Sequence, residues 1–188
     1  MKVKKVAILG GGNGGITAAA DLSSRGFEVS MFQSDKFCRD LSVIKEKGEI
    51  TLQTLESESV EKIHLVTDDI RQAILGAQII MLAIPGMAVE YFAEILAPVV
   101  GEEQIIYINS AAAMGCIRFI NKAREMGIDK QFKICESNSL TYGCRAFADE
   151  ARVEMSLSVK KLFLGAYPSC NTNEVMDALS QIYDCFVP

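Results

Sequence analysis

The chain has 188 residues, of which 49% are hydrophobic and 23% charged, and it carries a formal net charge of −5. These values are typical of a globular chain and exclude an intrinsically disordered, collagen-like or coiled-coil protein. The acidic balance also argues against a nucleic-acid partner, because nucleic-acid-binding domains are normally basic. At this length we expect a single domain that spans residues 1–188.

The N-terminal part predicts a strand, a helix and a second strand. An apolar run covers residues 3–9, and a glycine loop follows it. The next segment is predicted as a helix from four residues at helical spacing: Ile16, Ala19, Ala20 and Ser23. Residues 28–32 form the second apolar run. Two strands joined by a helix predict parallel pairing with a right-handed crossover.

The pattern of residues 35–67 is less regular. A helical turn over residues 41–47 precedes two alternating runs that we expect to pair as strands at the edge of the sheet: residues 49–55 and 62–67. Asp68 and Asp69 are then placed to cap a short helix, because aspartate oxygens accept hydrogen bonds from free helix N–H groups.

The remaining chain first resumes the alternation and then departs from it. Three further strands are expected at residues 77–84, 104–108 and 132–135. Two intervening helices carry apolar faces: Val89, Phe92, Leu96 and Val99, then Cys116, Phe119, Ile120 and Ala123. Three strands without helices follow at residues 140–146, 153–159 and 161–166, and a last helix carries Val175, Leu179, Ile182 and Phe186. The fold class is therefore α/β, a doubly wound Rossmann-type domain with a mostly parallel sheet and a few appended antiparallel strands.

The cysteines and the N-terminus indicate a cytoplasmic protein. The six cysteines show no C-x-x-C spacing, and His64 is the one histidine, so the sequence predicts no metal site. The apolar run after Lys5 is too short for a signal peptide, and no segment is apolar for long enough to cross a membrane.

The glycine loop predicts a dinucleotide site. Gly10, Gly12 and Gly15 form a G-x-G-x-x-G pattern that follows the first strand and opens the first helix. Gly10 permits the tight turn, Gly12 lets a pyrophosphate approach the backbone, and Gly15 lets the helix pack close to the sheet. The N-terminus of the helix offers N–H groups and a partial positive charge to the phosphates.

The end of the second strand favours NADP over NAD. An acidic residue usually holds the ribose 2′-hydroxyl of NAD at this point. This chain has Gln33 and Ser34 there, with Lys36 and Arg39 nearby. A 2′-phosphate would not be repelled, and the two basic residues could neutralise it. The alternative is that both basic residues simply face solvent.

Three loops at the carboxyl ends of later strands are expected to line the nicotinamide half of the site and the substrate mouth. Ligands of doubly wound sheets lie beyond these strand ends. The loops contain Ile84, Pro85 and Gly86 in the first, Asn109 in the second and Glu136 in the third. Pro85 and Gly86 can equally serve only to end their strand.

Three segments together resemble the octopine/nopaline (opine) dehydrogenase family. They are the glycine loop with its following T-A-A-A, the A-I-P-G-M-A turn that contains Pro85, and the stretch E-S-N-S-L-T-Y-G-C-R that begins at Glu136. The last segment discriminates, because Leu-x-Tyr-x-Cys-Arg is no part of the general dinucleotide fingerprint. The resemblance covers essentially the whole chain and is weakest between residues 35 and 60.

The resemblance implies an NAD(P)H-dependent dehydrogenase that condenses an amino acid with a 2-oxo acid. It places Gly10, Gly12, Asn13 and Gly15 at the cofactor, with Pro85 and Gly86 near it. Together with the glycine loop and the strand ends, the predicted cofactor-binding residues are Gly10, Gly12, Asn13, Gly14, Gly15, Gln33, Ser34, Arg39, Ile84, Pro85, Gly86 and Asn109. The implied substrate residues are Glu136, Cys144 and Arg145. Two alternatives stay open, namely that Arg145 pairs with Glu136 and that Cys144 is a packed thiol.

Two departures from the family concern catalysis. Asn109 begins a loop where the family tends to show a proline–glycine pair. The family's catalytic histidine belongs to a second, helical domain, whereas His64 lies in a predicted strand far from the expected site. We therefore expect the chain to be the cofactor domain alone, without a catalytic residue and inactive by itself. The apolar face left by the absent domain would favour a homodimer.

Two other functions remain as alternatives. The chain could be the cofactor domain of a ketopantoate-reductase-like or 6-phosphogluconate-dehydrogenase-like enzyme. This alternative does not explain the segment from Leu140 to Arg145. It could also be an NAD(P)-binding module without catalysis.

Overall fold

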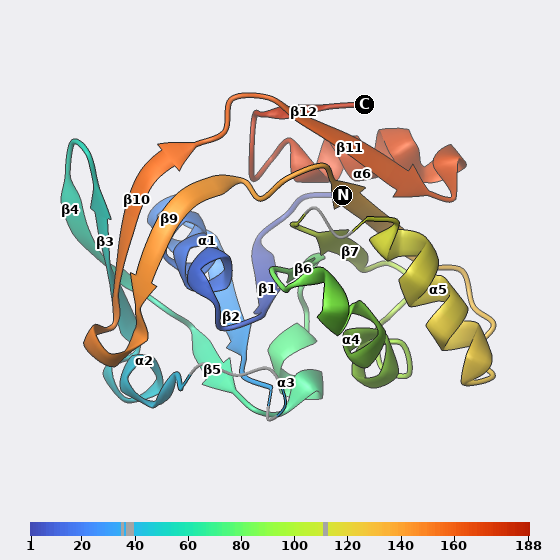
Figure 1. Cartoon of the computed structure of the whole chain (residues 1–188), viewed down its shortest axis with the longest axis horizontal. Coiled ribbons are helices and arrows are strands. Elements are labelled where there is room, and N and C mark those ends of the chain that lie inside the picture. The colour runs from blue at the N-terminus through green and yellow to red at the C-terminus, as the bar shows by residue number, and fades with distance from the viewer. Residues whose placement is uncertain (35, 37–39, 111–112) are drawn as a thin grey trace.

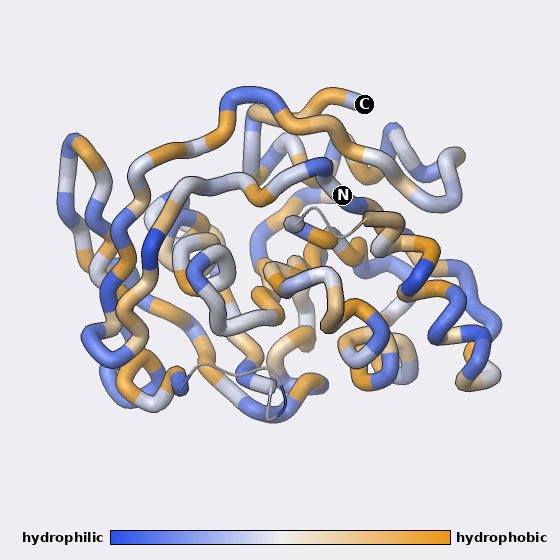
Figure 2. Tube along the Cα trace, viewed as in Figure 1, coloured by the Kyte–Doolittle hydropathy of each residue, from blue (hydrophilic) through white to orange (hydrophobic). Residues whose placement is uncertain are grey.

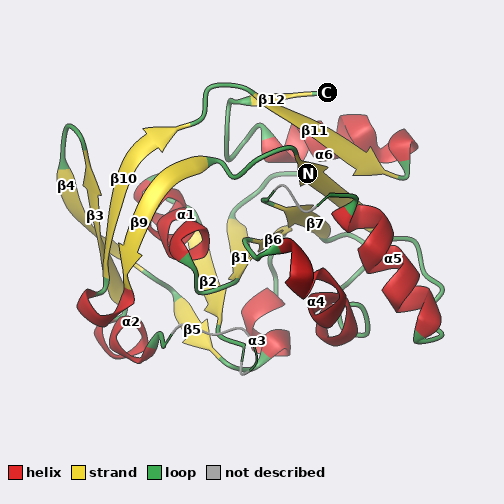
Figure 3. Cartoon of the chain, viewed as in Figure 1, coloured by secondary structure: helices red, strands yellow, loops and turns green. Residues whose placement is uncertain are grey.

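The computed structural model describes residues 1–34, 36, 40–110 and 113–188. It contains an eight-stranded sheet in the order β12-β11-β8-β7-β6-β1-β2-β5 and a four-stranded sheet in the order β4-β3-β10-β9 (Figures 1 and 3). The α/β class with a mainly parallel sheet, predicted from the alternating pattern, is confirmed.

Six strands of the large sheet run parallel to one another. They are β1 (Lys5–Leu9), β2 (Glu28–Phe32), β5 (Leu65–Thr67), β6 (Ile79–Leu82), β7 (Ile105–Ile108) and β8 (Lys133–Ser137). β11 (Leu162–Tyr167) then pairs antiparallel with β8, and β12 (Phe186–Val187) pairs parallel with β11. The strand order turns outward in both directions from the β1/β6 pair, so the switch point of this doubly wound sheet lies there.

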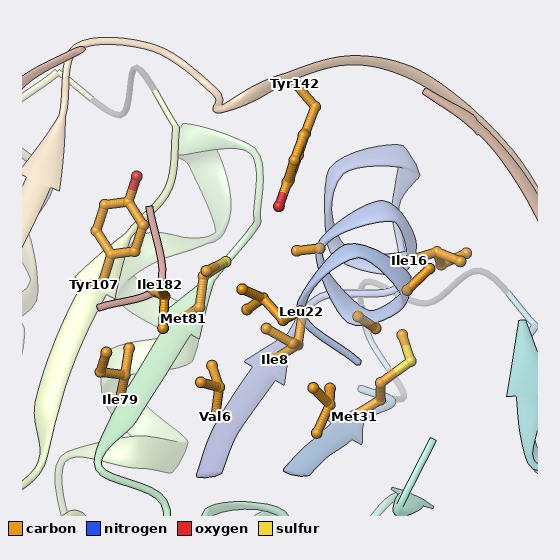
Figure 4. Packing of buried hydrophobic residues seen from close by; sticks show 14 of the residues in the cluster. Val6, Ile8, Ile16, Leu22, Met31, Ile79, Met81, Tyr107, Tyr142 and Ile182 are labelled. Carbon is orange, nitrogen blue, oxygen red and sulfur yellow. The ribbon is translucent and has the colours of Figure 1, made fainter. Parts of the chain in front are cut away.

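Both faces of the parallel sheet are buried, and successive residues of a strand face opposite sides. In β1, Ile8 packs in one core cluster and Leu9 in the other. Helices α3 (Ile70–Ile74), α4 (Val89–Leu96) and α5 (Gly115–Glu125) cover the Leu9 face. Helices α1 (Asn13–Ser24), α2 (Ser42–Lys47) and α6 (Thr172–Leu179) contribute to the Ile8 face. Figure 4 shows Ile8 and Met31 beneath α1, and Figure 2 shows hydrophilic stretches toward the periphery.

The four-stranded sheet covers the side of α1 that faces away from the parallel sheet (Figure 1). It consists of β3 (Glu49–Thr54), β4 (Glu58–Lys62), β9 (Tyr142–Phe147) and β10 (Arg152–Ser158). β3 is antiparallel to β4 and parallel to β10, and β9 is antiparallel to β10. Helix α1 is therefore enclosed between two sheets, and Ile16 and Leu22 are fully buried.

Two predictions about individual segments are wrong. Residues 49–55 and 62–67 do not form the expected pair of strands: β3 pairs with β4, which ends at Lys62, whereas β5 joins the edge of the large sheet beside β2. The sequence pattern missed β4 because its residues are mostly polar and exposed. The last helix also ends before Phe186, whose side chain reaches the core from β12 instead.

Short 3₁₀ turns in the described part of the chain lie at Gly86–Ala88, Ala148–Glu150 and Ser169–Asn171. None of the helices in the described ranges combines the length and the apolar character needed to cross a membrane.

Candidate functional site: the glycine loop and the strand ends around it

The glycine loop lies at the switch point, between the carboxyl ends of β1 and β6. Gly10 has a φ of +125°, and a Cβ atom there would lie 2.4 Å from the carbonyl oxygen of Ala83 at the end of β6. The Ala83 N–H donates to the carbonyl oxygen of Leu9 at 3.0 Å, which ties the two strand ends together. Only glycine fits position 10, because both its backbone angle and the space beside it exclude a side chain.

The other glycines of the loop differ in what surrounds them. At Gly15 a Cβ would lie 1.8 Å from the carbonyl oxygen of Gly10, and at Gly14 it would lie 2.7 Å from the side chain of Leu140. At Gly12, by contrast, a Cβ would meet no described atom within 4 Å. Gly15 is thus required by packing against the backbone, a side chain at position 14 would displace Leu140, and Gly12 faces open space at the N-terminus of α1.

Gly12 also occupies the N-cap position of α1, with an extended backbone (φ −81°, ψ −176°) and no side chain to cap the helix. The carbonyl oxygen of Gly12 accepts the first helical hydrogen bond, from the Ile16 N–H at 3.0 Å. The start of α1 therefore combines free space with helix N–H groups and the positive end of the helix dipole, the arrangement that binds phosphate in dinucleotide sites.

The segment 140–146, which carried the family resemblance, holds α1 and its loop in place. Leu140 packs over Gly14. The Tyr142 hydroxyl donates to Asp21 Oδ2 of α1 at 2.8 Å, and the Ala146 N–H donates to Asn13 Oδ1 at 3.2 Å. The Leu-x-Tyr part of the motif thus has a structural role toward helix α1.

Asp21 is a carboxylate with an exposed fraction of 4%, and its hydrogen-bond donors explain why it is tolerated there. Besides Tyr142, Arg25 donates to Asp21 Oδ1 at 3.1 Å. Tyr142 also shares a short hydrogen bond with the hydroxyl of Tyr183. Burial raises the pKa of both tyrosine hydroxyls well above their ordinary value, with the negative charge of Asp21 contributing, so both remain protonated donors at neutral pH.

Asn109 lies directly after β7 and is completely buried. Its Oδ1 accepts from the Thr141 N–H at 3.1 Å, from Thr141 Oγ1 at 2.8 Å and from the Tyr107 hydroxyl at 3.1 Å. Its Nδ2 contacts the sulfur of Met81 at 3.3 Å. Asn109 therefore connects the end of β7 to the segment over α1.

We predict that Asn109→Ala lowers the free energy of unfolding by about 3 kcal/mol, because the buried N–H and hydroxyl of Thr141 lose their acceptor. The Tyr107 hydroxyl keeps its hydrogen bond with Ser137 Oγ at 2.9 Å. Urea unfolding measures the change. Asn138→Ala is the matched control: Asn138 is exposed and its side chain accepts one hydrogen bond from the described residues, from the Phe163 N–H at 3.0 Å, so about 1 kcal/mol is expected. An Asn109→Ala chain that keeps its stability but loses cofactor affinity would instead place Asn109 in direct contact with the cofactor.

The end of β2 places two of the predicted cofactor residues side by side. The Gln33 N–H donates to the carbonyl oxygen of Thr67, which holds the strand end to β5. The hydroxyl of Ser34 is buried and donates to the hydroxyl of Tyr91 at 2.9 Å. Arg39 falls outside the described residues. Tyr91 was missed from the sequence because it lies on α4, outside the strand-end loops from which the other cofactor residues were predicted.

The turn after β6 borders the glycine loop. Ile84 is buried, and its side chain lies 3.1 Å from the position of a Cβ on Gly10. Pro85 is exposed and precedes the 3₁₀ turn that begins at Gly86. The turn both ends its strand and sits beside the loop, so the two interpretations from the sequence are compatible.

Glu136 belongs to β8 and lines a cavity of about 460 Å³ at the carboxyl end of the sheet. Its Oε2 accepts from the Gly115 N–H at 2.8 Å, which caps α5. The wall of the cavity is otherwise mainly apolar and includes Ala113, Met114, Asn138, Phe163 and Gly165.

Cys144 and Arg145 lie on β9, away from this cavity. Cys144 is half-buried and packs against the core cluster around α1. Arg145 is exposed and lies opposite Glu154 of β10, and among the described residues none forms an ion pair with it, Glu136 included. The structure does not bring the three predicted substrate residues together.

His64 lies just before β5 at the amino end of the parallel strands, whereas the glycine loop follows the carboxyl end of β1. Its side chain is half-exposed, and Nε2 is 3.3 Å from Glu28 Oε1 at the start of β2. Within the described part of the chain no three His, Cys, Asp or Glu residues gather closely enough to hold a metal ion.

Comparison with protein families places residues 5–116 in a family described as the NAD-dependent glycerol-3-phosphate dehydrogenase N-terminus. A curated relative, an opine dehydrogenase of Arthrobacter sp. (strain 1C), is 29% identical over 143 residues, which are 76% of this chain and 39% of the relative. The chain thus spans about two fifths of the length of that relative.

Several solved structures share the fold. An octopine dehydrogenase in complex with NADH and agmatine aligns at a TM-score of 0.67 with 24% identity, over 86% of this chain and 41% of the other. A yersinopine dehydrogenase with bound NADP+ gives 0.72 and 16%, over 100% and 47%. A probable 2-dehydropantoate 2-reductase from Bacillus subtilis gives 0.66 and 16%, over 97% and 56%.

Proposed function

Because the chain belongs to the family of N-terminal NAD-binding domains named after NAD-dependent glycerol-3-phosphate dehydrogenase, and resembles the corresponding domain of opine dehydrogenases, we propose that it binds NADPH for the reductive condensation of an amino acid with a 2-oxo acid. The observation that best supports a cofactor site is the difference in the surroundings of the loop glycines. Gly10 and Gly15 are closed in by backbone atoms, whereas Gly12 faces free space at the start of α1.

The residues of the chain fit a dinucleotide in both of its halves. Gly12 and the first turn of α1 would hold the pyrophosphate, and Gln33 and Ser34 would face the adenosine ribose. Ile84, Pro85 and Gly86 would border the nicotinamide half, where the bound cofactor supplies the hydride. The role of Asn109 in this arrangement is to fix the loop after β7 through Thr141.

The proton-transfer group of the reaction would come from outside this sequence. Imine reduction needs a group that holds or moves a proton within hydrogen-bond reach of the reacting atoms. His64 lies beside Glu28 at the amino end of the parallel strands, away from the glycine loop at their carboxyl end. We therefore assign no catalytic residue to this chain and place that group in a helical second domain of a longer protein.

The substrate residues follow the family resemblance. Glu136, beside the 460 Å³ cavity, is the best-placed of the three, because its carboxylate borders a space at the carboxyl end of the sheet. Ketopantoate reductases share the fold, so the fold alone does not separate the two reactions. The discriminating segment around Tyr142 favours the opine reaction.

Titration of the chain with NADPH and NADH tests the proposal. We expect both to bind, NADPH more tightly, and we expect no oxidation of NADPH when an amino acid and pyruvate are added. Absence of binding would contradict the cofactor site, and turnover by this chain would contradict the absence of a catalytic group. Tighter binding of NADH would contradict the NADP preference and make Asp35, the next acidic residue in the sequence, the ribose ligand to test.

A further inference from the structure

Tyr91 of α4 meets the end of β2 in a contact that the general dinucleotide fold does not require. Its hydroxyl accepts the hydrogen bond from buried Ser34 at 2.9 Å. The hydroxyl of Ser34 in turn accepts from the backbone N–H of Lys36 at 3.1 Å. A side chain from a different βα unit therefore determines how the chain leaves β2.

The ring of Tyr91 also holds the side chain of Lys36. The Lys36 ammonium lies 5.1 Å from the ring centroid, within the range of a cation–π contact. The ring itself is fixed from below, because Phe92 packs edge-on against it at 5.4 Å and Phe32, the last residue of β2, packs against Phe92 at 6.3 Å. The Lys36 ammonium is thus held just beyond β2 by a ring that itself packs against Phe92.

The position of this ammonium determines what it can recognise. In doubly wound sheets the residues just after the second strand face the 2′ position of the adenosine ribose. A positive charge held there favours a phosphate over a hydroxyl, and holding it in place before binding removes part of the ordering cost.

We propose that Tyr91 is a positioning residue for cofactor choice: its ring and hydroxyl fix Lys36 and Ser34 so that Lys36 binds the 2′-phosphate of NADPH. This inference rests on the proposed dinucleotide site and adds the residues that distinguish its two cofactors.

The test compares 2′,5′-ADP with 5′-AMP, which differ only in the 2′-phosphate, together with NADPH and NADH. The intact chain should bind 2′,5′-ADP at least ten-fold more tightly than 5′-AMP, and NADPH at least ten-fold more tightly than NADH. Lys36→Gln should remove most of this preference, and Tyr91→Leu should reduce it about three-fold. Tyr91→Phe keeps the ring and should retain more of the preference than Tyr91→Leu. In Lys36→Gln the affinity for NADH and 5′-AMP, which lack the 2′-phosphate, should change less than two-fold.

Two controls separate charge recognition from a structural effect. Lys2→Gln removes the same charge from an exposed position that precedes β1, and should leave the preference intact. Raising the salt concentration should weaken the preference in the intact chain and in Lys2→Gln, but not in Lys36→Gln.

The outcomes distinguish the two proposals. If NADPH and NADH both bind but the preference is absent, or survives Lys36→Gln unchanged, the assignment of Lys36 and Tyr91 is wrong while the dinucleotide site stands. If neither cofactor binds, the proposed function fails and this inference fails with it.

Discussion

Gly12→Val should reduce the affinity of the chain for NADPH by at least about 100-fold, equivalent to about 2.7 kcal/mol, while leaving the chain folded. The side chain would project into the space at the start of α1 that the pyrophosphate needs. The backbone at position 12 is extended and a Cβ there meets no described atom within 4 Å, so valine is accommodated without strain. Isothermal titration with NADPH measures the loss.

The stability of the same variant provides the control. We expect its free energy of unfolding in urea to stay within about 1 kcal/mol of the original chain, the range for exposed positions and for loss of a glycine N-cap. A Gly12→Val chain that binds NADPH normally would show that the phosphates lie elsewhere.

Gly15→Ala, unlike Gly12→Val, should destabilise the fold, and we expect its free energy of unfolding to fall by about 3 kcal/mol or more. The added methyl group would lie 1.8 Å from the carbonyl oxygen of Gly10, a backbone atom that cannot rotate away. Relief of the clash requires α1 to move from the sheet, although α1 is enclosed on both sides. Urea unfolding of Gly15→Ala and of the original chain measures the effect.

Gly165→Ala is the matched control for this substitution. Gly165 lies in β11, and a Cβ there meets no described atom within 4 Å. Its unfolding midpoint should therefore remain equal to or above that of the original chain, because alanine in a strand loses less conformational entropy than glycine. Equal unfolding midpoints for Gly15→Ala and Gly165→Ala would contradict the close contact between Gly15 and the carbonyl oxygen of Gly10.

The parallel part of the fold could be predicted from the sequence because each of its elements carries its own signal. The runs before Gly10 and after Gly76 are apolar because both faces of the sheet are covered, and the helices between them show one apolar face. The polar strand β4 carries no such signal. Its place beside β3 depends on pairing rather than on burial.

The candidate site likewise contains parts that could be predicted from the sequence and parts that could not. The glycine loop could be predicted because its residues are contiguous and their spacing reflects the backbone geometry that they must adopt. The contacts of Asn109 with Thr141 and of Ser34 with Tyr91 join residues far apart in the chain, and no local pattern marks either pair. Arg145, taken from a contiguous motif, lies on an exposed strand face, because alternate residues of a strand point to opposite sides.

The layer over α1 has a consequence for biosynthesis. Thr51 of β3 pairs with Arg152 of β10, so the hairpin made early by the ribosome waits for its central partner until most of the chain has emerged. Until then the outer side of α1 stays uncovered, as does the inward face of β3 with Ile50 and Leu52. A nascent chain stopped before residue 152 would therefore expose these apolar side chains and be a substrate for chaperones.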